Sequence, residues 1–320
     1  MPSSLPIELQ LRIIEVAFPP ATSRNCSTRL DLLRSLSLVH RDWTHAAQKA
    51  YWTHLICTRA SSVAATLAFA AKLGWLAGRG IEVKVIELWA LMSPAVSFED
   101  CYEPILKIVQ QMHGGAEELV LNAVDGDTRL VQRFLDVFHA KYLRVTVDPT
   151  ARRSSAHLHV LTSSTLSRLH LSHLRLLCMP RLLSGLDTLI LDEVELATTP
   201  PNLLSCAPNL RAFGWNSPPC TPIQLCFMQA SSKLEHIFFS FQPVKGMDAL
   251  SLFPTLHEVF LALRSLPAKL DSLTMVLPAG FATEMVEEKA CDGPWATDET
   301  DIDVRELKAG AKTDFEVWWP

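Results

Sequence analysis

Apolar residues over positions 5–18 recur at the three- and four-residue spacing of an α-helix and form two rows. The rows are Leu5, Leu9, Ile13 and Val16 on one side, and Ile7, Ile14 and Phe18 beside them. Pro6 suits the first turn of this helix, with Ser3 or Ser4 as its cap and Glu8 favourable for the helix dipole. A helical module of about 50 residues cannot bury so much apolar surface internally, so we expect the remainder to be buried against a partner.

A second pattern recurs farther along the chain: an apolar residue, two variable residues, an apolar residue, one variable residue and another apolar residue. This is the strand half of a leucine-rich repeat. It begins at Val83, Ala116, Tyr142, Leu166, Leu186, Leu210, Leu234, Leu256 and Leu270. From residue 116 to residue 256 the starts are 20 to 26 residues apart, close to the period of about 20–29 residues of such repeats. The spacing predicts a solenoid.

Several segments between these strands are predicted helices, and others are predicted short links. Helical spacing of apolar residues predicts helices at TRLVQRFLDVFHA and PIQLCFMQASS, and the step of 33 residues from Val83 to Ala116 leaves room for a helix at CYEPILKIVQQMHGG. PPNLLSCAPN is a predicted turn or single-turn helix. The predicted unit is therefore strand, turn, helix, strand, stacked into a curved parallel sheet with helices on the convex side. Val63–Gly78 is a further predicted buried helix; it is too short to span a bilayer and contains Lys72.

The variable residues of the strands are the candidates for binding a target, because alternate side chains point to the concave face. Six of them are predicted to contact a target protein: Val120, His170, Ile190, His236, Phe238 and Phe260. Four of the six are apolar where solvent favours polar groups, which indicates an exposed apolar patch. The alternative is that a carboxy-terminal segment folds over this face and buries it.

The carboxy-terminal segment, residues 281–320, has a distinct composition. It contains eleven acidic and four basic residues, a net charge of −7 against +2 for the rest. Alternation in Asp301–Val304 and Phe315–Trp318 predicts a strand hairpin that caps the end of the sheet. The alternative is an acidic surface for a basic substrate, or a regulatory tail.

Composition narrows the class of protein. With 48% apolar and 20% charged residues among 320, the chain has enough apolar residues for a large core. A net charge of −5 and the lack of a basic stripe argue against nucleic-acid binding. The first residues have no secretory signal, so we expect an intracellular protein, cytoplasmic or nuclear, that does not bind membranes.

Signals for metal binding and catalysis are weak. The eight cysteines form no CxxC pair, and the histidines at 157, 159, 170 and 173 have no accompanying ligand cluster. GxSxG, HExxH and Gly-rich phosphate motifs are missing, and VDGD at 124–127 has too few oxygen ligands for a cation. We predict no metal, no cofactor and no enzymatic activity, with an enzyme whose site follows no known motif as an alternative.

Residues 4–52 together resemble an F-box. The matching positions are Leu5, Pro6, Glu8, Leu9, Ile13, Ile14, Leu36, Leu38, Val39, Arg41, Trp43 and Trp52. The loop FPPATSRNCSTRLD is longer and more polar than that of a minimal F-box, and we interpret it as a tolerated surface insertion. The alternative is that these helices are an ordinary cap on the repeats.

The resemblance implies an F-box protein of the type abundant in fungi, with a leucine-rich-repeat-like domain. Its fold class would be α/β, with a helical F-box at 1–58, a repeat solenoid at 59–280 and an acidic cap at 281–320. Such proteins are similar to substrate receptors of Skp-cullin-F-box ubiquitin ligases, which do no bond chemistry and raise the effective concentration of a target.

By the same resemblance, nine residues would bind the Skp linker subunit, and through it a cullin, or hold the helices that do so. They are Leu5, Pro6, Ile7, Leu9, Ile13, Ile14, Leu36, Val39 and Trp43. The alternative function is a repeat-type protein-binding scaffold not linked to ubiquitylation.

Overall fold

The structure is a computed structural model in which the chain divides into two compact units, residues 1–122 and 123–320. The residues that the structure describes are 6–19, 25–58, 60, 62–89, 102–111, 116–122, 128–147, 155–157, 165–178, 183–196, 207–217, 233–241, 252–264, 266, 269–278, 281 and 283–306.

Unit 1 begins with three helices, α1 Ile7–Ala17, α2 Cys26–Val39 and α3 Arg41–Trp52. Both α1 and α2 pack on α3. The N-cap of α1 is Pro6, whose carbonyl oxygen accepts hydrogen bonds from the Leu9 and Gln10 amides, so the expectation of a serine cap is wrong. The polar segment before α2 is shorter than predicted because its last residues already form the first helical turns.

Three parallel strands follow in unit 1, β1 His54–Cys57, β2 Val85–Leu88 and β3 Glu118–Asn122, hydrogen-bonded in that order. The repeat pattern predicted β2 and β3. β1 starts two residues after α3 ends, so part of the predicted helical segment 1–58 is the first strand of the sheet. Its Leu55 pairs with Ile86, which extends the apolar register one strand earlier than predicted.

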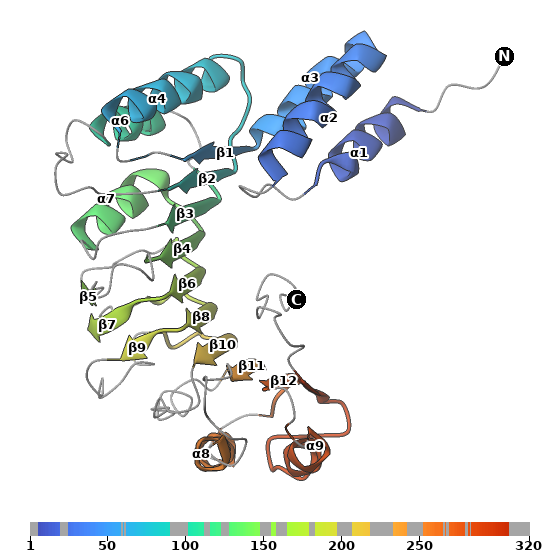
Figure 1. Cartoon of the computed structure of the whole chain (residues 1–320), viewed down its shortest axis with the longest axis vertical. Coiled ribbons are helices and arrows are strands. Elements are labelled where there is room, and N and C mark those ends of the chain that lie inside the picture. Colours follow the sequence, from blue (N-terminus) through green and yellow to red (C-terminus); the bar gives the residue numbers. More distant parts are fainter. Residues whose placement is uncertain are drawn as a thin grey trace. The chain divides into compact units, whose positions relative to one another are not determined.

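Two helices pack beside these strands in unit 1, α4 Val63–Ala77 and α6 Glu103–Gln111 (Figure 1). Both were predicted as helices, α4 because it is the most apolar stretch of the chain and α6 because the step between two repeat starts leaves room for a helix. Leu73 and Leu76 of α4 are buried, whereas Leu67 and Trp75 are exposed, so α4 is buried on one side only. No described helix is long and apolar enough to cross a membrane.

Unit 2 contains the helix α7 Thr128–Phe138 and seven neighbouring parallel strands (Figure 1). In sheet order the strands are β4 Tyr142–Thr146, β6 Arg168–Ser172, β8 Thr188–Asp192, β10 Ala212–Ser217, β11 His236–Phe241, β12 Ser272–Leu277 and β13 Asp301–Glu306. Leu169, Leu189, Phe213, Ile237 and Leu273 lie side by side across β6 to β12, and all are buried. The α/β class with parallel strands is confirmed.

The predicted register of the repeat in β4 is wrong by two residues. Leu143 pairs with Leu169, and Val145 pairs with Leu171. The pattern therefore begins at Ala140, which is fully buried, and not at Tyr142. Alanine is only weakly apolar at the first position, and Val147 after the strand is apolar. The register that starts at Tyr142 therefore matched the repeat template as well as the register that starts at Ala140.

The strand predicted at Leu256–Leu261 is a helix, α8 Phe253–Arg264. Leu256, Val259, Phe260 and Leu263 are buried at the spacing i, i+3, i+4, i+7, and Leu261 is exposed. The strand template and a helix share the first of these steps, so the pattern alone could not separate them.

The middle repeats of unit 2 contain a second short strand. β5 Ser155–His157, β7 Arg175–Cys178 and β9 Glu195–Leu196 form a three-stranded parallel sheet. His173 and Glu193, at equivalent positions before β7 and β9, have positive φ angles of 55° and 52°, which turn the chain between the two sheets. The described residues between α7 and α8 include no helix. The predicted helix PIQLCFMQASS and most of PPNLLSCAPN lie outside the described residues.

The carboxy-terminal part of unit 2 consists of α9 Thr283–Cys291 and β13. β13 pairs in parallel with β12, with Ile302 beside Leu273 and Val304 beside Met275. Asp301–Val304 therefore continues the sheet instead of starting a separate hairpin cap. The predicted second strand, Phe315–Trp318, lies outside the described residues.

Candidate functional site

The outer face of α1 in unit 1 is apolar and open to solvent. Leu9, Ile13 and Val16, the first of the two rows in the sequence, are 52%, 52% and 71% exposed. In the second row, Ile14 and Phe18 are buried. One side of α1 therefore supplies the core of the three-helix bundle, and the opposite side remains an apolar surface of the kind that marks an interaction site. Leu5, which continues this row, lies outside the described residues.

The residues predicted to bind a Skp subunit divide into two groups. Ile14 is fully buried, and Leu36 and Trp43 pack against the cluster that it forms with Phe18 and Ala47. These three side chains hold the helices together, and Trp43 also donates from Nε1 to Gln10 Oε1 over 2.7 Å. The members that face solvent are Pro6, Ile7, Leu9, Ile13 and Val39.

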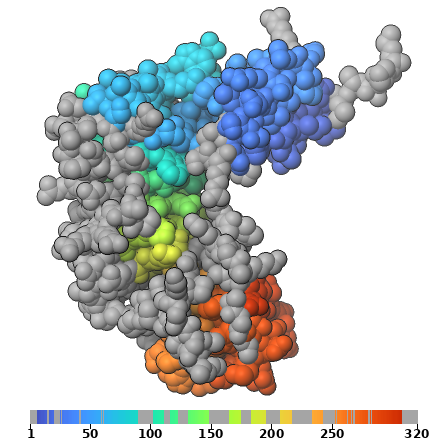
Figure 2. All heavy atoms as spheres, in the orientation of Figure 1, coloured from blue at the N-terminus to red at the C-terminus, as the bar shows by residue number. Residues whose placement is uncertain are grey.

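Three further apolar side chains of α1 and α2 are exposed without having been predicted as binding residues: Leu11, Val16 and Leu38. Leu38, at the end of α2, is 87% exposed, and Leu11 on α1 is partly exposed. Leu38 was recognised only as a position of the motif, and Val16 only as a member of the helical row. The whole bundle is blue in Figure 2. Its exposed large apolar residues belong to α1 and to the end of α2.

Arg29 fixes the bundle from within. Its guanidinium donates from Nη2 to the carbonyl oxygens of Ala50 and Tyr51 over 3.1 and 3.2 Å, and from Nη1 to that of Pro19. It also lies over the rings of Phe18 and Tyr51. A buried cation at the carboxyl end of α3 is favourable because that end of a helix carries partial negative charge.

The predicted target-binding surface on the strands is not exposed. Ile190 and Phe238 are 3% and 1% exposed, and Val120 and His170 are also buried, while His236 is partly buried. Parallel sheets are covered on both faces, so apolar residues at the variable positions indicate a second buried layer. Phe260 is not on a strand: it lies on α8 and stacks on Trp295. The prediction of an exposed apolar patch is therefore wrong.

Polar side chains are buried on the same face of the strands in unit 2. Nε2 of His170 lies 3.0 Å from Ser172 Oγ, and Asn216 donates from Nδ2 to Asp192 Oδ1 over 2.6 Å. Burial, and secondarily the charge of Arg144, lowers the pKa of His170 to about 3, so its imidazole is neutral. Burial also raises the pKa of Asp192, against the opposing effect of its hydrogen bond from Asn216.

The pair of His170 and Ser172 has the spacing of a base and a nucleophile but not the arrangement. The carboxylate of Asp192 contacts the serine and not the histidine: Ser172 Oγ donates to Asp192 Oδ2 over 3.4 Å. Nδ1 of His170 faces the hydroxyl of Tyr142 instead of a carboxylate. Both His170 and Ser172 are buried. The group therefore satisfies buried polar atoms of neighbouring strands and presents no reactive hydroxyl to a substrate.

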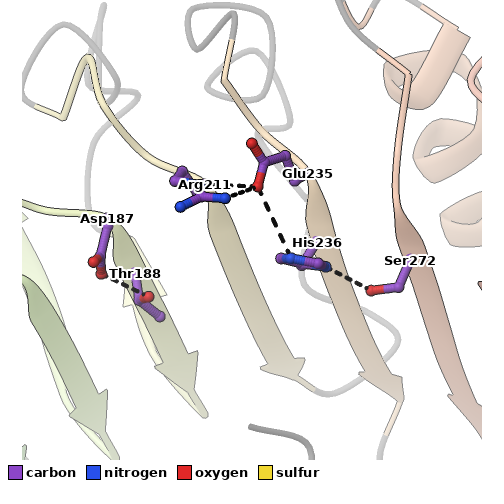
Figure 3. A network of polar contacts seen from close by, with 6 residues as sticks. All are labelled: Asp187, Thr188, Arg211, Glu235, His236 and Ser272. Atoms are coloured by element: carbon purple, nitrogen blue, oxygen red, sulfur yellow. Dashed lines mark hydrogen bonds and ion pairs between the residues drawn. The ribbon is translucent and has the colours of Figure 1, made fainter. Parts of the chain in front are cut away.

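A charged network lies where β8, β10 and β11 begin (Figure 3). Arg211 donates from Nε to Glu235 Oε2 over 2.8 Å, and its pKa is raised by this hydrogen bond and by the charge of Glu235. Nδ1 of His236 lies 3.0 Å from Ser272 Oγ on the next strand. Thr188 donates to the carboxylate of its neighbour Asp187.

One group of possible metal ligands occurs among the described residues, and it belongs to this network. Glu235, His236 and Asp271 bring one ligand atom each within 4.8 Å of the others. The Glu235 oxygen already accepts two hydrogen bonds from Arg211, whose cation would compete with a metal ion. We therefore interpret the group as part of an ion-pair network.

Unit 1 has a buried carboxylate at the corresponding face of its strands. Glu87 lies 3.1 Å from His54 Nε2 on β1 and accepts from Asn122 Nδ2 on β3 over 3.0 Å. Trp89 Nε1 donates to the same carboxylate. Three neighbours thus satisfy the carboxylate, as a buried charge requires.

Comparison with known proteins adds no assignment: no family model matches the chain, and no curated protein and no solved structure shows significant similarity to it.

Proposed function

We propose that this protein is an F-box-type adaptor whose α1 surface docks on a Skp linker subunit and whose repeat-like strands and their connections hold a target protein for ubiquitylation. The observation that supports it is the solvent-facing row Leu9, Ile13 and Val16. The bundle has a separate core around Ile14, so this row is not needed for its folding. An apolar row of this kind suits a helix-in-groove contact, read by side chains spaced three and four residues apart.

The proposal assigns different roles to the residues of the motif. Leu9, Ile13 and Val39 would contact the Skp subunit, and Ile14, Leu36 and Trp43 would keep the three helices in place. The target would bind outside the buried strand residues, because Ile190 and Phe238 are not accessible. The adaptor would act by proximity, bringing a lysine of the target near the conjugating enzyme.

The test is co-purification of the full chain with a purified Skp linker subunit. Leu9→Asp/Ile13→Asp should weaken binding more than about 100-fold, because each apolar side chain buried in an interface contributes at least about 1.4 kcal/mol. The matched control is Val63→Asp/Leu67→Asp, a pair with the same spacing on α4 whose side chains are 37% and 48% exposed.

Binding by the wild type and the control, with loss in the α1 variant, would support the adaptor. Failure of a folded wild-type chain to bind, or equal binding by both variants, would contradict it. Circular dichroism and thermal unfolding of all three proteins show whether a variant has lost its fold.

A second candidate is a protein-binding scaffold in which the helices cap the sheet. It is favoured by the direct continuation of α3 into β1, whose register continues that of β2 and β3. Lys72 on α4 also lies between the rings of Trp52 and Trp75, which ties α3 to α4. This candidate predicts no affinity for a Skp subunit, so the same experiment separates the two.

A further inference from the structure

A cavity of about 430 Å³ lies between α8 and α9 in unit 2, within the range of roughly 300–1,000 Å³ that is common for small-ligand sites. Leu256 and Phe260 of α8 and Met285 and Val286 of α9 form its apolar wall. The two helices are neighbours in Figure 1, and their orange and red atoms are visible at the lower end of Figure 2. Methionine and an exposed Leu261 give this wall side chains that can adapt to a ligand.

Two cations from opposite helices line the same cavity. Arg264 ends α8 and Lys289 lies in the last turn of α9, and both are exposed. Among the described residues, neither has an ion-pair partner. Asp292 is the acidic residue of the lining, so the cations are in excess there. An apolar cavity with cations at its edge is complementary to a molecule with an apolar body and a negative end.

A buried donor in the cavity wall lacks an acceptor. Trp295 is 2% exposed, and its Nε1 has no hydrogen-bond partner among the described residues. Buried N–H groups are nearly always paired, and an unpaired one is costly. An oxygen atom of a bound molecule would satisfy this donor.

Neighbouring residues fix the position of Trp295. Its ring stacks on Phe260 with centroids 6.0 Å apart and an angle of 19° between the planes. Its carbonyl oxygen accepts a hydrogen bond from the Leu270 amide over 3.0 Å, just before β12. A Cβ atom at Gly293 would overlap the Trp295 ring, so only glycine leaves room for the ring there. Stacking on Phe260, the backbone hydrogen bond from Leu270 and the space left by Gly293 thus fix Trp295 beside the cavity.

We propose that this cavity binds a small amphipathic carboxylic acid. Its apolar body lies against Phe260, Met285 and Val286, its carboxylate pairs with Arg264 and Lys289, and one of its oxygen atoms accepts a hydrogen bond from Trp295 Nε1. The site does not depend on the docking of α1 on a Skp subunit.

The test is isothermal titration of the full chain with decanoate and with its uncharged counterpart decanol, both below the concentrations at which they aggregate. The wild type should bind decanoate at least tenfold more tightly than decanol. Arg264→Gln/Lys289→Gln should weaken decanoate at least tenfold and leave decanol within about twofold, since only the charge pairing is lost. Lys107→Gln/Lys141→Gln, a pair of exposed lysines outside the cavity, is the control and should bind like the wild type.

The second part of the test uses a variant in which a larger side chain fills the cavity. Met285→Trp places a large side chain in the cavity and should abolish binding of both compounds, with thermal unfolding used to show that the variant is folded. No decanoate binding by the wild type, equal affinity for decanoate and decanol, or binding that survives both Met285→Trp and the loss of the two cations would each overturn the proposal.

Discussion

The outer row of α1 (Leu9, Ile13 and Val16) and the strand-face row of unit 2 (Ile190 and Phe238) are both apolar, although neither row belongs to the periodic positions that form the core of its element. The surroundings of the two rows differ. Leu9 and Ile13 on α1 are half exposed, whereas Ile190 and Phe238, on β8 and β11, are buried. A helix in a small bundle buries one side, so a second apolar row is left in solvent. A strand of a parallel sheet has two covered faces, so the same excess of apolar residues adds to the core.

This difference removes the buried strand residues from the expected target surface and leaves the outer row of α1, which was already expected to bind a partner, as an exposed apolar surface. An apolar residue on the strands contributes to folding stability, and removing it should be costly. An apolar residue in the outer row of α1 contributes little to stability and is available for binding. Substitutions in the two rows should therefore have opposite effects on stability and on association.

The largest difference is expected between Phe238→Ala and Ile13→Ala. Phe238→Ala should lower the free energy of unfolding by about 3–5 kcal/mol, because it leaves a cavity in a packed core. Ile13→Ala should change it by less than about 0.5 kcal/mol, as is usual for exposed positions. Urea unfolding of the full-length variants measures both values. Similar losses at the two positions would mean that the outer row of α1 is part of a core.

Arg29→Ala should destabilise unit 1 by about 2–3 kcal/mol, since it removes hydrogen bonds from a charged donor to buried carbonyl groups. Arg29→Lys should recover only part of this loss, because an ammonium group cannot reproduce the fork in which Nη1 reaches Pro19 while Nη2 reaches Ala50 and Tyr51. Hydrogen exchange at the end of α3 reports the effect locally. A lysine variant as stable as the wild type would show that charge alone holds the bundle.

His170 makes the stability of unit 2 depend on pH. Its pKa is lowered to about 3 in the folded chain, from 6.5 in the unfolded chain. The unfolded chain therefore gains a proton below pH 6.5 that the folded chain does not, so this stability is fully present above pH 6.5 and is lost as the pH falls towards 3. Between pH 7 and pH 5 the loss should be about 2 kcal/mol.

The measurement for His170 is urea unfolding at pH 7 and pH 5 of the wild type and of His170→Gln, which cannot titrate. The difference between their pH dependences isolates the histidine from the carboxylates that titrate in the same range. The same dependence in both proteins would show that His170 is accessible to protons, and that the strand face is open.

Arg211→Gln should have the smallest effect of the series. The ion pair with Glu235 is short, but the guanidinium is exposed, and exposed pairs contribute little because solvent screens them. The thermal midpoint should hardly change in low salt and not at all in high salt. A clear loss of stability would indicate that Glu235 carries a buried charge that needs this partner.

The strands were predictable because the sequence repeats two apolar positions that must face one core. Leu169 and Leu171 and their equivalents in β8 and β12 lie in register, as the pattern required. α1 and α7 were predictable from helical spacing, α4 from its high apolar content, and α6 from the length of chain between two repeat starts. Leu256–Leu261 was wrongly predicted because the strand template and a helix share the three-residue step, and Tyr142 because two overlapping registers were both apolar.

The functional surfaces were less predictable. The sequence indicated that α1 had more apolar surface than its bundle could bury, but it did not show which of the two rows faces solvent. It left open whether the variable positions of the strands are exposed or covered, because apolar residues on a strand do not show what lies against its second face. The cavity between α8 and α9 was missed because α9 carries only two apolar residues there, Met285 and Val286, and because no pattern in the sequence marks the contact between Gly293 and Trp295.

The most direct test of the account is hydrogen exchange of the full chain with and without a purified Skp linker subunit. The account predicts that the amides of Ile7–Ala17 become protected when the subunit is added, while those of α4, whose exposed Val63 and Leu67 serve as an internal control, exchange as before. Unchanged exchange throughout α1 at saturating subunit, or protection of α4 to the same extent, would contradict the claim that the outer face of α1 is the docking surface.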